Sequence, residues 1–160
     1  SHSTNILIAS FLVEVSQLPV SPRFWPLKSF LPLASESVAA GFPSPADDYI
    51  DAGIDLNEHL IRHPASTFFL KVKGESMTNA GIQSGDLLIV DRSLDPQPGC
   101  IVVAILDGYF TLKKLVRRKE ILYLEAEHPS YPPIDLRNYE NVEIWGVAVY
   151  SIHQLIHKNI

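Results

Sequence analysis

The sequence lacks a second cysteine and any long apolar run. With Cys100 as its single cysteine, the chain cannot form an internal disulfide or a cysteine-rich metal site. One thiol is compatible with a reducing compartment, and we expect the protein in the cytoplasm. The most apolar N-terminal stretch, residues 6–13, is far shorter than the about 20 residues that a membrane-spanning helix needs. We therefore expect no membrane anchor.

A surplus of basic residues is also missing. The chain has 13 Lys and Arg against 18 Asp and Glu, a net charge of −5. Direct binding of nucleic acid depends mainly on Lys and Arg side chains that neutralise phosphates and release counterions. We expect no direct, sequence-specific DNA binding, so any link to nucleic acid should run through a partner protein.

Prolines dominate the first part of the chain. Six of them fall between residues 19 and 45, and each removes a backbone donor and restricts the residue before it. Residues 16–46 are therefore predicted to form an extended arm without a long regular element. The run from Ser44 to Asp48 is typical of a helix start, with a capping serine, an early proline and two acids. Short helical segments are predicted between about 45 and 62.

From residue 67 onward the pattern changes to short runs of β-branched and aromatic residues. The predicted strands are residues 67–72, 86–90, 100–106, 109–116, 121–126 and 142–150. Asp107-Gly108 separates two of them and favours a two-residue type I′ turn, since both of its positions need positive φ. The fold class predicted is mostly β, with mainly antiparallel strands behind an extended N-terminal arm with short helices.

Three groups of residues suggest a metal or reactive thiol but have simpler interpretations. His59 and His63 are four residues apart, as two zinc ligands on a helix would be. The sequence pattern indicates no third ligand, so we favour a structural pair of surface histidines. Cys100 begins an apolar strand and is favoured as a small buried hydrophobic residue. The pair Asp47 and Asp48 suits helix capping better than a metal. We expect neither a metal nor a cofactor.

Ser76 and Lys113 form a candidate catalytic pair. A serine hydroxyl is a weak nucleophile unless a base takes its proton, and a lysine amine can do so only when it is neutral. Burial penalises the charged form of lysine, and Lys113 stands in a largely apolar strand. Strand alternation places Lys113 and Lys114 on opposite faces but does not decide which one points inward.

Several stretches together resemble one family in order and spacing. They are AGFPSPADDY at 40–49, IDLN at 54–57, GESM at 74–77, SGDLLIVD at 84–91 and DGYFTLKKL at 107–115. The sequence resembles the LexA-type self-cleaving Ser–Lys peptidases and, among them, the UmuD-like mutagenesis proteins. No helix-turn-helix pattern precedes residue 41, so an operator-binding repressor is not expected.

The resemblance implies a role for particular residues. Ser76 matches the nucleophile, Lys113 the general base, and Ala40-Gly41 the bond that is cut. The backbone N–H groups of Ser76 and Met77 are the expected oxyanion donors. Residues 1–40 would be an arm removed by self-cleavage, and residues 41–160 a β-rich peptidase and polymerase-binding domain.

The resemblance also implies partners. Family members form homodimers, cut themselves when they dock on the RecA filament on single-stranded DNA, and join a UmuC-like Y-family polymerase as an accessory subunit for translesion synthesis in the SOS response. Cleavage within one chain or on a dimer partner both remain open. One alternative is a non-cleaving peptidase-fold module that regulates RecA or a polymerase by contact. Another is a signal-peptidase-like enzyme, which would need a membrane anchor.

Overall fold

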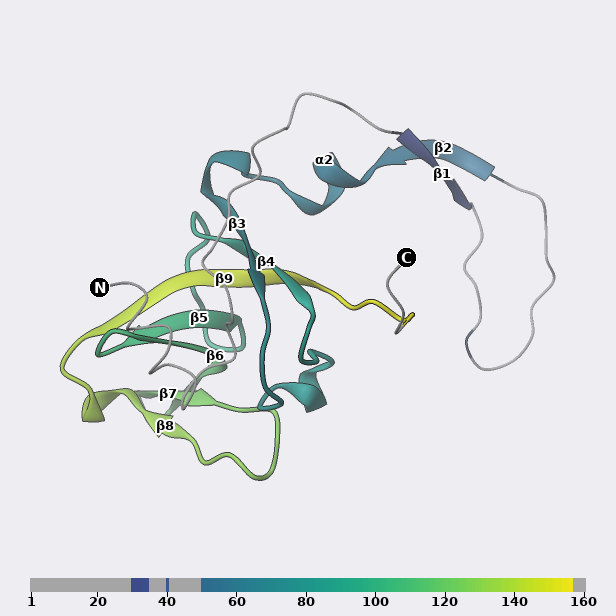
Figure 1. The fold of residues 1–160 in the computed structure, drawn as a ribbon. Coiled ribbons are helices and arrows are strands. Elements are labelled where there is room, and N and C mark those ends of the chain that lie inside the picture. The colour runs from purple at the N-terminus through teal and green to yellow at the C-terminus, as the bar shows by residue number, and fades with distance from the viewer. Residues whose placement is uncertain (1–29, 35–39, 41–49, 157–160) are drawn as a thin grey trace. The chain divides into compact units, whose positions relative to one another are not determined.

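The structure, a computed structural model, describes residues 30–34, 40 and 50–156 (Figure 1). The chain divides into two compact units. The smaller unit contains residues 23–62, and the larger one contains residues 1–22 together with 63–160.

The smaller unit contains a two-stranded antiparallel sheet. β1 (Phe30–Ala34) pairs with β2 (Ile50–Asp55), from Phe30 opposite Asp55 to Ala34 opposite Ile50. The short helix α2 (Leu56–Leu60) follows directly, and the Asp55 side chain caps it by accepting a hydrogen bond from the Asn57 N–H at 3.1 Å. Antiparallel pairing thus places β1, which belongs to the arm, beside β2, which follows the arm in sequence.

The helical prediction for this region is partly wrong. Residues 50–55 form a strand, because pairing with β1 satisfies their backbone groups and Gly53 weakens a helix. Only α2 is helical in the described part of the predicted segment, and it ends before His63, so His59 and His63 share no helix face. The predicted helix start at residues 44–48 lies outside the described residues.

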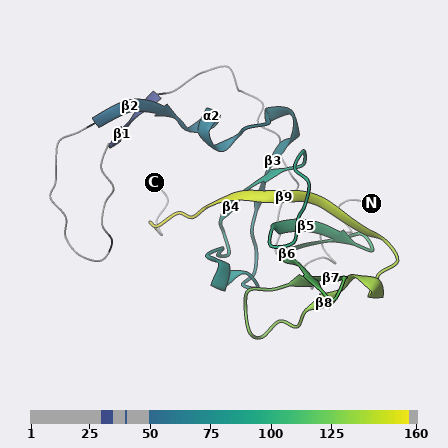
Figure 2. The ribbon, with the colours of Figure 1, turned by 180° about the vertical axis from the view of Figure 1, so that it is seen from behind.

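A seven-stranded sheet forms the larger unit (Figures 1 and 2). Its strands are β3 (Thr67–Lys71), β4 (Leu87–Asp91), β5 (Ile101–Leu106), β6 (Tyr109–Arg118), β7 (Ile121–Glu125), β8 (Ile134–Asp135) and β9 (Val142–Ile152). The spatial order is β3-β4-β9-β5-β6-β7-β8, and all neighbouring strands run antiparallel. The six predicted strands are confirmed to within two residues at each end, and β8 is additional. Three 3₁₀ turns, η1 (Pro64–Ser66), η2 (Thr78–Ala80) and η3 (Leu136–Asn138), lie between strands.

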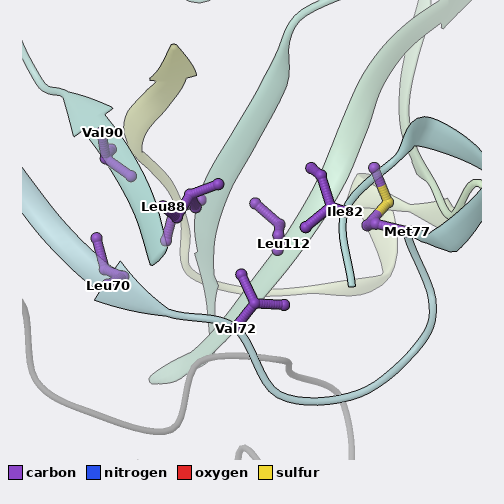
Figure 3. Packing of buried hydrophobic residues seen from close by; sticks show 8 residues of the cluster. Leu70, Val72, Met77, Ile82, Leu88, Val90 and Leu112 are labelled. Atoms are coloured by element: carbon purple, nitrogen blue, oxygen red, sulfur yellow. The ribbon is translucent and has the colours of Figure 1, made fainter. Parts of the chain in front are cut away.

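Two clusters of buried apolar side chains make up the core. The first contains Leu70, Val72, Met77, Ile82, Leu88, Val90, Val103 and Leu112 (Figure 3). The second contains Val102, Ala104, Leu106, Leu115, Leu124 and Val147, with Cys100 packed against it. Because successive residues of β5 enter different clusters, this strand is buried on both faces. The half-buried Cys100 thus behaves as the small hydrophobic residue that was predicted.

Two tight hairpin turns flank β6. Asp107 and Gly108 have φ of 47° and 90°, which confirms the predicted type I′ geometry between β5 and β6. Lys119 and Glu120 make the turn between β6 and β7 with φ of 49° and 65°, although neither residue favours positive φ. The second turn therefore carries local strain that the first does not.

We expect the double substitution Lys119→Asn and Glu120→Gly to raise the free energy of unfolding by about 1–2 kcal/mol, since Asn-Gly adopts this turn without strain. Urea unfolding of the variant and the wild-type protein measures this. Gly108→Ala is the control and should lower stability, since it introduces at one turn the strain that is removed at the other. An unchanged midpoint for the double variant would contradict the assignment of strain.

Asp91, the last residue of β4, carries a buried carboxylate. Asp91 is 4% exposed and accepts hydrogen bonds from the Ser93 N–H at 2.8 Å, from the hydroxyls of Ser93 and Ser66 at 2.6 and 3.2 Å, and from His63 Nδ1. Burial raises the pKa of Asp91, but the hydrogen bonds from Ser93, His63 and Ser66 outweigh it and hold the pKa below its usual value of 3.8. Asp91 therefore fastens the chain before β3 to the end of β4.

A depressed pKa in the folded state contributes stability that is present above the unfolded pKa and is lost as pH falls through the folded value. We expect Asp91→Asn to lower the free energy of unfolding by about 1–3 kcal/mol at pH 7. The difference from wild type should shrink as pH falls below 3.8. Urea unfolding at pH 7, 5, 4 and 3 tests this, and a difference that stays constant over the series would contradict it.

Candidate active site

Ser76 lies in the loop between β3 and β4, which we call the serine loop (residues 73–85). The two ends of the loop are joined by main-chain hydrogen bonds: the Gly85 N–H donates to the Val72 carbonyl at 2.7 Å, and the Val72 N–H to the Asp86 carbonyl at 2.9 Å. Gly85 has a φ of 95°, which a side chain would strain. The loop is thus closed at its base like a hairpin.

Apolar packing fixes the middle of the serine loop. Met77 and Ile82 are buried in the first core cluster, where Figure 3 shows them beside Leu112 of β6. The N–H groups of Ala80 and Ile82 both donate to the Met77 carbonyl, at 3.0 and 3.2 Å, and so wrap the chain around η2. Ser76, the residue before Met77, is 0% exposed. Its backbone position is therefore set by its neighbours on the C-terminal side.

Lys113 of β6 points inward and meets Ser76. Its Nζ lies 3.1 Å from Ser76 Oγ, 2.9 Å from Thr111 Oγ1 and 3.1 Å from the Leu112 carbonyl oxygen, and the residue is 3% exposed. Lys114, on the other face of the strand, is half-buried and pairs with Glu127 at 3.3 Å. The structure thus resolves the choice that alternation left open: Lys113 is the buried lysine.

Thr111 is a member of the site that the sequence analysis did not assign. It is 0% exposed, and its hydroxyl lies next to the amine of Lys113. Its position two residues before Lys113 on the same strand was the available signal, since residues i and i+2 share a face. Thr111 and Ser76 contact the amine from two separate segments and so limit where it can lie.

The other predicted site residues are the oxyanion donors, Ser76 and Met77, and the two residues of the bond expected to be cut, Ala40 and Gly41. The N–H groups of Ser76 and Met77 donate to no acceptor among the described residues, whereas those of Thr78, Ala80 and Ile82 are all engaged. Ala40 belongs to the smaller unit, where it forms an exposed bend in the segment that joins β1 to β2. Gly41 lies outside the described residues.

Neither a metal centre nor a membrane span is found in the described part of the chain. Residues 30–34, 40 and 50–156 contain no group of three or more His, Cys, Asp or Glu side chains that could hold a metal ion. Among the same residues, no helix has the length and apolar character needed to cross a membrane.

The amino-acid sequence matches a known peptidase family over most of its length. The family model described as peptidase S24-like matches residues 32–149, a segment that runs from β1 into β9. The chain belongs to the S24 peptidase family. The matched segment includes Ala40, the serine loop and Lys113, and so takes in every described residue of the candidate site.

Individual relatives point to the same branch of the family. The chain is 43% identical to Protein SamA of Salmonella typhimurium over 137 residues, which cover 86% of this chain and 95% of SamA. It is 46% identical to Protein ImpA of Escherichia coli over 77% of this chain and 83% of ImpA. It is also 41% identical to the LexA repressor of Pasteurella multocida, over 74% of this chain and 56% of the repressor.

These matches confirm the resemblance to UmuD-like proteins and the predicted LexA/UmuD-like, mostly antiparallel β fold. This S24 chain is a self-cleaving serine peptidase of the class that acts in the SOS response.

We expect Thr111→Val to slow self-cleavage at least about tenfold, because the amine of Lys113 loses one of the groups that hold it at Ser76. Thr111→Ser retains the hydroxyl and should stay within about threefold of wild type. Intact-mass measurements of chain cleavage over time give both rates. Equal rates for the valine and serine variants would show that the hydroxyl of Thr111 has no part in the reaction.

Proposed function

We propose that Ser76 and Lys113 form the catalytic dyad and that the chain cuts its own Ala40–Gly41 bond. The observation that supports this most directly is the 3.1 Å contact between Lys113 Nζ and Ser76 Oγ, both in buried residues. A base must lie within hydrogen-bonding reach of the hydroxyl that it deprotonates, and this distance meets the requirement.

Burial would prepare Lys113 to act as a base. Removing an ammonium from water disfavours the charged form, and Lys113 is 3% exposed. A neutral amine can donate N–H groups to the Leu112 carbonyl and to Thr111 Oγ1 while it turns its lone pair toward Ser76. The three contacts therefore suit the protonation state that the reaction needs.

The proposed reaction has two steps. Lys113 takes the Ser76 proton as Oγ attacks the carbonyl carbon of Ala40, and the N–H groups of Ser76 and Met77 stabilise the oxyanion. Lys113 then protonates the Gly41 nitrogen, the Ala40–Gly41 bond breaks, and an ester between Ser76 and Ala40 remains. Water then attacks the ester carbon while Lys113 takes its proton, and Lys113 passes that proton to the leaving Ser76 Oγ, which restores Ser76 and frees the carboxyl group of Ala40.

The β1–β2 pair favours presentation of the proposed bond. In the sequence, the two strands flank residues 35–49, the segment that contains Ala40 and Gly41, and Ala40 is exposed. A substrate that belongs to the same polypeptide, or to a dimer partner, is supplied at high effective concentration and needs no tight pocket. Cleavage there would divide the protein into an arm, residues 1–40, and a retained domain, residues 41–160.

The proposed biological setting follows the family resemblance. A homodimer in the cytoplasm would be stimulated by the RecA filament on single-stranded DNA, which favours the cleavable arrangement by shifting a population. The retained domain would then join a UmuC-like Y-family polymerase in translesion synthesis. The net charge of −5 agrees with recruitment to DNA through such partners and not through direct contact.

Intact-mass spectrometry of the purified chain at pH 7 and about pH 10 tests the proposed function. Ser76→Ala and Lys113→Ala are measured in parallel. We expect fragments of residues 1–40 and 41–160 that form faster at pH 10, because the neutral amine is more populated there. Neither variant should give fragments.

A different cleavage position would remove Ala40–Gly41 from the proposal, and cleavage by Ser76→Ala would remove the dyad. A chain that stays whole at both pH values is then incubated with RecA filaments. Lack of cleavage there too would favour the non-cleaving module that acts by contact.

A further inference from the structure

Asp86 is a buried carboxylate at the end of the serine loop that the proposed reaction does not use. It is the residue before β4 and is 1% exposed. Its Oδ2 accepts hydrogen bonds from the Gln83 N–H and from the Ser151 hydroxyl, both at 2.9 Å, and its Oδ1 lies 2.6 Å from His153 Nδ1. A carboxylate has only acceptors, so His153 carries the hydrogen on Nδ1.

These contacts join three segments that are distant in sequence. Gln83 belongs to the serine loop, Asp86 leads into β4, and Ser151 and His153 lie at the C-terminal end of β9 and just after it. The Asp86 main chain also closes the base of the loop, since its carbonyl accepts the Val72 N–H. One residue thus fixes the loop to both of its neighbouring strands and to the strand β9.

We infer that Asp86 is a positioning residue for Ser76. It holds the serine loop against the end of β9, so that Ser76 Oγ stays within reach of the Lys113 amine on β6. The inference rests on the proposed function, because its effect on rate acts through Ser76. A displacement of about 1 Å at a nucleophile is enough to cost up to about a hundredfold in rate, so a residue that fixes the loop has a measurable effect.

The chemistry requires an acid at this position. Three donors converge on the two oxygens of Asp86, and an asparagine would offer one acceptor oxygen and turn an NH₂ group toward the others. Asp86→Asn therefore breaks the junction with little change in side-chain volume. The surrounding donors would be left partly unpaired in a buried place.

Asp91 provides a matched control at the other end of β4. It is also a buried aspartate that accepts from a histidine Nδ1, two serine hydroxyls and a backbone N–H. Its donors come from His63, Ser66 and Ser93, and none of them belongs to the serine loop. Asp91→Asn should therefore cost a similar amount of stability without moving Ser76.

The experiment compares pH–rate profiles for self-cleavage of the full chain between pH 7 and 10, at a temperature where circular dichroism shows each variant to be folded. We expect Asp86→Asn to lower the plateau rate at least about tenfold and Asp91→Asn to stay within about twofold of wild type. The double variant Ser151→Ala, His153→Ala keeps Asp86 and removes two of its donors. Its plateau rate should lie between those of Asp86→Asn and Asp91→Asn. If Asp86→Asn does not fold, the double variant takes its place in the comparison.

Equal plateau rates for the Asp86 and Asp91 variants would overturn the inference, as would a wild-type rate for the Ser151/His153 double variant. Hydrogen exchange of the uncleavable Ser76→Ala chain gives a readout that does not depend on cleavage. Adding Asp86→Asn should speed exchange in residues 73–85 at least about tenfold, and adding Asp91→Asn should not. If this difference is seen while the wild-type chain never cuts itself, the proposed function fails and the Asp86 junction stands. If both variants exchange alike, the inference fails.

Discussion

The amine of Lys113 lies inside the larger sheet, within hydrogen-bonding distance of Ser76, Thr111 and the Leu112 carbonyl. An amine in such a place is stable only if its polar atom is satisfied, and burial favours its neutral form. The face of β6 that carries Lys113 must therefore be covered. Thr111 and Leu115 share this face and are buried, and Leu115 belongs to the second core cluster.

The serine loop brings the second half of the site to this strand. Its middle is anchored by Met77 and Ile82 in the first cluster, while its base is closed by main-chain bonds and by the Asp86 carboxylate. Strand β4 is consequently fastened at both ends by a buried aspartate, Asp86 near the site and Asp91 away from it. A fixed loop on a rigid sheet suits a reaction that depends on the position of one hydroxyl.

Much of this could be predicted from the sequence, because local patterns determine it. Runs of β-branched and aromatic residues predicted six strands of the larger sheet, and Asp107-Gly108 predicted the turn between β5 and β6, as positive φ at both residues confirms. The β1–β2 pair could not be predicted from local patterns, because each strand is stabilised by pairing with the other, about twenty residues away in the sequence. The Lys119-Glu120 turn was missed for the opposite reason, since its residues contradict the geometry that the flanking strands impose.

The candidate site shows the same division. The GESM motif and a lysine pair on one strand were visible, but the inward orientation of Lys113 and the contact with Thr111 depend on how β6 packs. The Asp86 junction was not visible, because Ser151 and His153 lie more than sixty residues further along the chain. The β1–β2 pair, finally, bears on what becomes of the arm. Cleavage at the proposed Ala40–Gly41 bond would separate β1 from β2 in sequence, so that among the described residues their ladder alone would hold β1, and an isolated two-stranded sheet is marginal in water. Loss of the covalent link would lower the local concentration of β1 at β2, so dilution would favour separation of the two strands and oppose rejoining of the cut ends.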